Sequence, residues 1–335
     1  MTTIEPWVCP SGAHNARQLQ LDHPEAMRAI TELDRVGHEI LSRCGDTPRD
    51  TPKDSEKQGI NTPVSDPLEW LVGVALLRKT VSAFGGLRAL IEGASLDPAK
   101  SVCRTIFELW LATRCYAYGA TPSIYADTPP LASERVARSR YYYVAAQRRA
   151  LRSRALILSP RSPYRPADLS SLDALEAELT TQLNTLRSDF PAEWAYFGDI
   201  TPARLIDTGR FDDEPAWYTP SFSSTPVHSI RDLAYAFGYP WEYDTIYDLF
   251  SGQVHPRGWA ADLEIEEDGV SVLHPRNPEA FPLVAFYGTS WHLMSLLAAA
   301  CIHAPGALPT LRAFEHDWRP HLRALSPVAA LLRLA

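Results

Sequence analysis

Residues 97–119 read DPAKSVCRTIFELWLATRCYAYG and are the clearest helix in this chain. Asp97 and Pro98 are typical of a helix start, because an aspartate side chain caps the first turn and the proline nitrogen needs no hydrogen-bond partner there. Gly119 is typical of the residue that follows a helix. Apolar residues lie on nearly every side of this segment, so we expect a helix that is buried in the core.

The same caps and the same apolar periodicity predict further helices on both sides of this one. They cover about residues 24–43, 65–92, 131–158, 170–188, 228–237, 241–254 and 282–303, with short helices after the last. Residues 190–227 are expected to be irregular, with a helical turn near 202–206, and residues 261–275 to form a two-stranded hairpin or an ordered loop. The predicted fold class is therefore all-α, a helical bundle with long irregular loops and at most a small β-hairpin.

Length and composition place the chain among ordinary globular proteins. It has 335 residues, of which 45% are hydrophobic and 21% charged. We expect residues 1–64 to form an N-terminal helix and a polar loop, and residues 65–335 to form the helical bundle domain. Five cysteines without CxxC spacing and an N-terminus without a signal-peptide pattern predict a cytoplasmic protein that does not enter a membrane.

The formal net charge is -8. Nucleic-acid binding depends on Lys and Arg, so this charge argues against a protein that binds nucleic acid over its whole surface. A local basic face remains open. Arg138, Arg149 and Arg152 fall close to one face of the helix predicted over 131–158, and we expect them to bind RNA or another phosphate-bearing ligand. The alternative is a solvated face whose charges are paired by acids.

Two groups of polar residues are candidates for catalysis. Arg104 and Glu108 are four residues apart, so they share one face of their helix, and a charged pair on so apolar a helix needs partners or a cavity. Tyr247, Ser251 and His255 also follow at steps of four and form one stripe of the helix over 241–254. A following proline should end that helix, where the helix dipole favours the charged imidazolium of the histidine.

This combination resembles a known family. The Arg-x-x-x-Glu pair, followed by a later Tyr-x-x-x-Ser-x-x-x-His-Pro motif, is similar to the bacterial family DUF5677 over about residues 68–257. The family name implies no established activity. Its helical-bundle character resembles HEPN domains, many of which are RNases in toxin–antitoxin and anti-phage systems. HEPN nucleases usually carry Arg-x(4–6)-His on one helix, whereas here the arginine and the histidine come from different helices.

The chemistry of RNA cleavage fits these residues. Attack by a 2′-hydroxyl needs a base, an acid and positive charge at the phosphate. Glu108 and His255 are candidates for the proton transfers and Arg104 for a bidentate contact to the phosphate. We therefore expect a metal-independent RNase or phosphodiesterase without a cofactor, acting in phage defence or a stress response. The alternative is a non-catalytic binding or interaction module in which these three residues form a structural polar network.

Two further features leave alternatives open. The apolar helix over 282–303 predicts either a core helix or the interface of a homodimer. An aromatic cluster in the irregular segment can line the pocket of a small-molecule enzyme or hold a long loop onto the bundle. Its members are Trp194, Tyr196, Phe197, Trp217, Tyr218 and Phe222.

Overall fold

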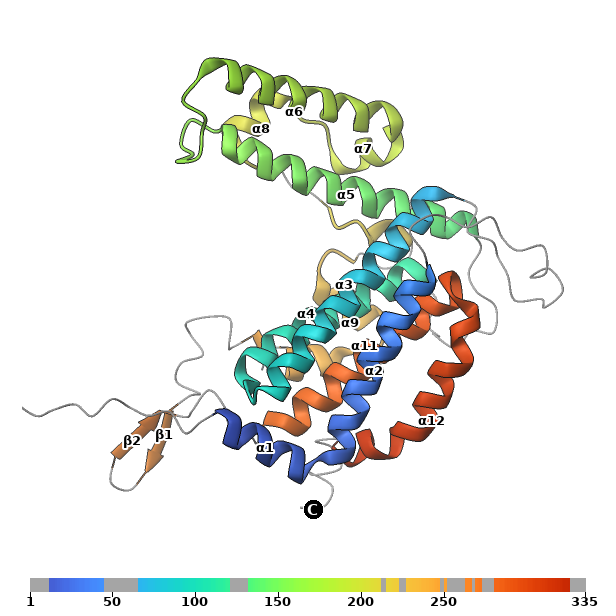
Figure 1. Ribbon diagram of the computed structural model, residues 1–335. Coiled ribbons are helices and arrows are strands. Elements are labelled where there is room, and N and C mark those ends of the chain that lie inside the picture. Colours follow the sequence, from blue (N-terminus) through green and yellow to red (C-terminus); the bar gives the residue numbers. More distant parts are fainter. Residues whose placement is uncertain are drawn as a thin grey trace, which may run out of the picture.

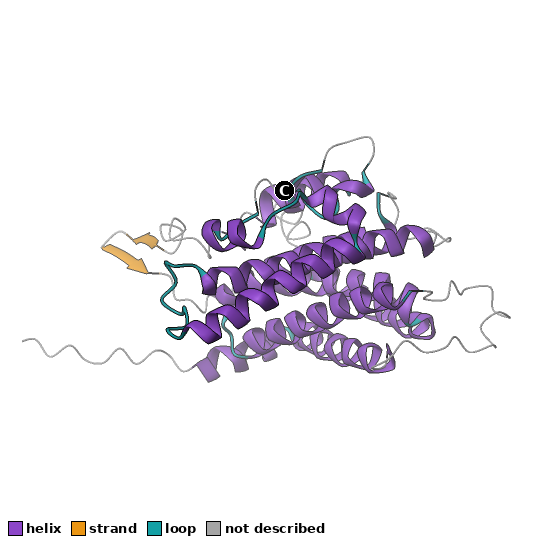
Figure 2. Cartoon of the chain, turned by 90° about the horizontal axis from the view of Figure 1, so that it is seen from above, coloured by secondary structure: helices purple, strands orange, loops and turns teal. Residues whose placement is uncertain are grey.

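The computed structural model describes residues 12–44, 66–120, 132–211, 215–222, 227–247, 250–251, 263–266, 269–272 and 280–325. Helices make up nearly all of the regular structure in these ranges (Figure 2). One pair of strands, β1 (Leu263–Glu266) and β2 (Gly269–Val272), forms an antiparallel hairpin that lies outside the helices (Figure 1). The predicted all-α class is confirmed.

The core of the bundle is built around α11 (Phe281–His303), the most apolar helix of the chain. It packs against α2, α3, α4 and α12, which span Pro24–Cys44, Pro67–Glu92, Leu96–Tyr118 and Leu308–Ala324 (Figure 1). By length and composition, α3 and α11 are both long and apolar enough to cross a membrane, and α11 is mostly buried inside the fold. A further helix at the edge of the bundle, α1 (Gly12–Asp22), was not predicted.

Local sequence explains the hairpin of α3 and α4. Asp66 caps α3, because its Oδ1 accepts a hydrogen bond of 2.7 Å from the amide of Leu68, and a proline occupies the first turn. A short connection follows, in which Ala94 has a φ of 51°. The predicted cap of α4 is wrong: Asp97 lies inside the first turn and pairs with Lys100 at 2.7 Å.

A second group of helices extends away from the bundle (Figure 1). Besides its contacts with α3 and α4, the helix α5 (Ala132–Leu158) packs against α6, α7 and α8, which span Leu169–Asp189, Pro191–Phe197 and Pro202–Thr208. We call α6, α7, α8 and the second half of α5 the arm. The short helix α8 confirms the helical turn expected near 202–206. The helix α7 was not predicted, because seven residues are too few to show a helical period.

The aromatic cluster packs a long connection against α5. Trp194, Phe197, Trp217 and Tyr218 are all buried. Trp217 packs edge-to-face on Tyr142 of α5, with 4.9 Å between ring centroids. These contacts support the interpretation that the cluster fixes a long connection onto a helix.

Candidate functional site

The helix α4 places Arg104 and Glu108 one turn apart at the edge of the bundle. Arg104 Nε lies 3.2 Å from Glu108 Oε1, and the two side chains are 27% and 37% exposed. The opposite face of the helix, which includes Ile106 and Trp110, is fully buried. The expectation that α4 is buried on every side is therefore wrong on the face that carries the charged pair.

Tyr247 joins this pair from a distant part of the chain. Its hydroxyl donates a hydrogen bond of 2.8 Å to Glu108 Oε1. The guanidinium carbon of Arg104 lies 4.8 Å from the centroid of the Tyr247 ring, within the range of a cation–π contact. The Tyr243 ring stacks on the Tyr247 ring with 4.6 Å between centroids and an interplanar angle of 17°. The structure thus brings Tyr247 into contact with the pair of Arg104 and Glu108.

The segment that carries Tyr247 is not the α-helix that the spacing predicted. Residues Glu242–Tyr247 form a π-helical turn, η3. Short π-helical turns are rare and occur frequently at functional sites, since the wider turn displaces side chains from their α-helical positions. The turn follows α9 (Ile230–Ala236), whose start is fixed by a capping box between Ser229 and Asp232.

Ser251 supports this segment and does not extend the charged cluster. Its side chain is buried, and its hydroxyl donates a hydrogen bond of 2.7 Å to the main-chain oxygen of Tyr247. This is a local bond to the residue four positions earlier. His255, the fifth predicted residue, lies outside the described residues, so its membership of the site stays a prediction.

The surroundings of the cluster keep Arg104 charged and the Tyr247 hydroxyl protonated. Burial raises the pKa of the Tyr247 hydroxyl far above its ordinary value, and the hydrogen bond to Glu108 adds to this effect. Partial burial opposes the charge on Arg104, but Tyr247 and Glu108 outweigh it and raise the pKa of the guanidinium. The permanently charged, partly exposed guanidinium of Arg104 can bind a phosphate, and the adjacent carboxylate of Glu108 can accept a proton.

The predicted basic face of α5 is not formed as expected. Arg138 is buried at the junction with the bundle, where it donates hydrogen bonds of 2.9 and 3.3 Å to the main-chain oxygens of Tyr116 and Ala117. Arg149 and Arg152 are exposed on the arm, and Arg152 Nε donates to Gly209 O at 2.9 Å. The prediction of a shared nucleic-acid-binding face is wrong for Arg138, because spacing along one helix does not show which side another helix covers.

A buried polar cluster at the start of α5 was missed by the sequence reasoning. Glu69 and Arg135 form an ion pair of 2.6 Å in which both side chains are fully buried. Tyr116 donates to the main-chain oxygen of Glu69 at 3.0 Å, and its hydroxyl lies 3.0 Å from His303 Nε2. The signal for this cluster was a carboxylate in the apolar first part of α3, which has no other charge before Arg78. Because the ion pair is sealed from solvent, it fixes α5 against the bundle and has no access to a substrate.

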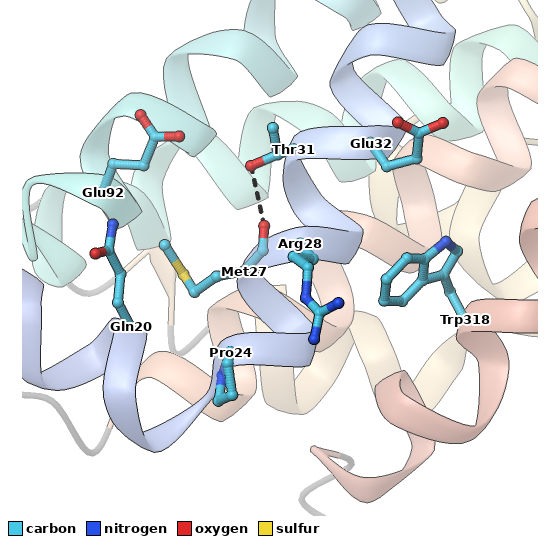
Figure 3. A pocket seen from close by; sticks show the side chains of 8 residues that line it. All are labelled: Gln20, Pro24, Met27, Arg28, Thr31, Glu32, Glu92 and Trp318. Atoms are coloured by element: carbon cyan, nitrogen blue, oxygen red, sulfur yellow. Dashed lines mark hydrogen bonds between the residues drawn. The ribbon is translucent and has the colours of Figure 1, made fainter.

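A hollow of about 680 Å³ lies elsewhere, between α1, α2, α3 and α12. Figure 3 shows that most of its wall comes from α2, with Gln20, Glu92 and Trp318 contributed by the other three helices. Its charged side chains are used locally, since Arg28 pairs with Glu25 on the same helix. Of the predicted site residues, those that the structure describes do not line this hollow.

The fold and the cluster define the protein as a helical bundle with a partly open Arg–Glu–Tyr site at one edge. Residues 71–270 match the model of the family of unknown function DUF5677. This range is more than half of the chain, so the protein belongs to that family, and the range includes all five predicted catalytic residues. No curated protein and no solved structure matches the chain.

Proposed function

We propose that this protein is a HEPN-like phosphodiesterase that cleaves RNA without a metal ion, in phage defence or a stress response. One observation carries the proposal. Arg104, Glu108 and Tyr247 come together from segments that are 139 residues apart, and yet both charged side chains keep contact with solvent. A purely structural ion pair in a core would be closed, as the pair of Glu69 and Arg135 is.

Each residue has a role in the proposed reaction. Glu108 takes the proton of a ribose 2′-hydroxyl, whose oxygen then attacks the adjacent phosphorus. The bond from phosphorus to the 5′-oxygen breaks, His255 gives a proton to that leaving oxygen, and a 2′,3′-cyclic phosphate remains. Arg104 holds the phosphate oxygens as negative charge develops on them. Tyr247 fixes the orientation of Glu108 through its 2.8 Å hydrogen bond.

Cleavage of a fluorescently labelled single-stranded RNA in the presence of EDTA tests this proposal. We expect Glu108→Gln and His255→Ala each to slow cleavage about 10²–10⁴-fold, as is usual for loss of a general base or acid. Glu178→Gln on the arm is a matched control, because this exposed glutamate also pairs with an arginine, at 2.9 Å. A wild-type protein that leaves the RNA intact, or a Glu108→Gln variant of unchanged rate, refutes the proposal.

A non-catalytic module is the second candidate, and one observation favours it. Glu108 Oε1 accepts hydrogen bonds from both Arg104 and Tyr247, so part of the hydrogen-bonding capacity of this carboxylate is already used within the cluster. If the cluster were a buried structural network, Arg104→Ala would cost roughly 3–5 kcal/mol of stability. The 27% and 37% exposed fractions of the pair instead predict a cost below about 1 kcal/mol. Urea unfolding of this variant separates the two functions.

A further inference from the structure

The end of the arm exposes an unusual concentration of apolar side chains. Nine large apolar side chains are exposed among the described residues, and four of them lie within residues 156–169: Leu156, Ile157, Tyr164 and Leu169. Tyr164 is 81% exposed and Leu169 is 76% exposed. They come from the last turn of α5, the loop after it and the first turn of α6, at the tip farthest from the bundle (Figure 1). Exposed apolar side chains gathered in one place mark interaction sites.

The arm tip also has a hollow on its surface. A hollow of about 300 Å³ is formed there by Leu156, Ile157, Pro163 and Tyr164. A hollow of this size receives one large side chain of a partner, in the way that anchor residues fill pockets at protein interfaces. Arg161 also lines the hollow, so a positive charge lies at its wall.

The loop that forms the hollow is held by its own hydrogen bonds. The amide of Ser162 donates to Ser159 O at 2.9 Å, and the amide of Tyr164 donates to the Ser162 hydroxyl oxygen at 3.2 Å. Asp168 caps α6 by accepting from the amide of Ser171 at 2.7 Å. Prolines at 160, 163 and 166 restrict the backbone between these bonds. A partner therefore meets a surface that is already ordered, which lowers the entropic cost of binding.

The charge of the tip is opposite to that of the chain. Residues 149–170 contain five arginines and one acidic residue, whereas the whole chain has a formal net charge of -8. Arg154 is paired with Glu178 on α6. Arg149, Arg152 and Arg161 are exposed, and Arg161 lines the hollow together with the apolar residues. The partner should therefore carry acidic residues around its apolar contact.

We propose that the arm tip, residues 149–170, is a docking site for an acidic amphipathic segment of a partner protein. One bulky apolar side chain of that segment enters the hollow beside Tyr164, and flanking Asp or Glu side chains meet the arginines. The hollow favours a peptide over a bilayer, because a fluid lipid surface has no single side chain to fill it. The exposed leucines favour a peptide over RNA, which is bound chiefly through its phosphates and by stacking on aromatic rings. The docking site is independent of the reaction proposed above.

Selection of random short peptides displayed on phage against the full-length protein tests the docking site. We expect the enriched peptides to share a bulky apolar residue flanked by Asp or Glu. A labelled synthetic copy of one such peptide should lose affinity about tenfold or more for the double variant Ile157→Asn, Tyr164→Ser, since removal of an anchor contact commonly costs that much. Arg161→Glu should weaken the same peptide several-fold, and more strongly at low salt.

Leu21→Ser is the matched control. Leu21 is 68% exposed on α1, away from the arm, and its loss should leave the affinity of the peptide unchanged. All the variants change exposed side chains, so their melting temperatures should equal that of the wild type.

Three outcomes overturn the proposal. Selection can enrich no shared pattern, or the synthetic peptide can bind the double variant as tightly as the wild type. The double variant can also abolish co-flotation with vesicles of anionic phospholipid, or binding of single-stranded RNA, while peptide affinity stays unchanged. That last result would assign the tip to a membrane surface or to nucleic acid.

Discussion

The replacement His292→Leu should make the stability of this protein less sensitive to acid. His292 is fully buried on α11, and its ring stacks on Phe84 with 4.1 Å between centroids and an interplanar angle of 6°. Within the described part of the chain, neither ring nitrogen has a hydrogen-bond partner. Burial, together with the neighbouring His38, lowers the pKa of His292 to about 3.

The magnitude follows from the linkage between protonation and folding. In the unfolded chain the imidazole takes up a proton below pH 6.5, whereas in the folded protein it does so only near pH 3. Between these values the unfolded state binds more protons, so the free energy of unfolding falls by up to about 1.4 kcal/mol for each unit of decrease in pH. From pH 7 to pH 5 this single residue should remove roughly 2 kcal/mol of stability.

Urea unfolding at pH 7, 6 and 5 measures this difference. The loss of stability on acidification should be smaller in His292→Leu than in the wild type by about 2 kcal/mol. His316→Gln is the control, because His316 is 90% exposed and its replacement should leave the pH dependence of the wild type unchanged. Parallel pH dependences in the wild type and in His292→Leu would refute the reasoning.

Two further predictions concern packing in the bundle. In Gly73→Ala the new Cβ would lie 1.8 Å from His303 Nε2, so we expect a loss of roughly 1–3 kcal/mol of stability. In Gly86→Ala the new Cβ meets nothing within 4 Å, and the protein should gain about 0.5–1 kcal/mol. Equal midpoints of urea unfolding for the two variants would contradict the close contact at Gly73. Arg135→Met leaves Glu69 buried without its 2.6 Å partner and should cost about 3–5 kcal/mol, most of which Glu69→Leu in the same chain should restore. A double variant that unfolds as readily as Arg135→Met alone would contradict this account.

Much of the helical framework was predictable because its signals are local. Caps, prolines and apolar periodicity act within a few residues, and they placed α2, α3, α5, α6 and α11 within one or two residues of their observed ends. The helix α1 was missed because its mixed sequence shows no apolar face. The π-helical turn η3 was read as an α-helix, since the sequence pattern of so short a segment does not distinguish the two.

The candidate site was predictable in part. Arg104 and Glu108 stood out as charges on an apolar helix, and the spacing of four placed them on one face. Their contact with Tyr247, and the turning of the charged pair toward solvent, came from the packing of a segment that is distant in sequence. The role of Ser251 as a local support for the turn was likewise visible only in the structure.

The sequence by itself therefore determined the all-α class, the positions of the long helices and the pairing of Arg104 with Glu108. Only the tertiary structure decided which arginines of α5 face the core and which face solvent. Arg138 is buried because main-chain oxygens of α4 accept its hydrogen bonds, whereas Arg149 is exposed on the arm. The burial of a charge depends on partners from other helices, and those partners are set by the packing of the whole bundle.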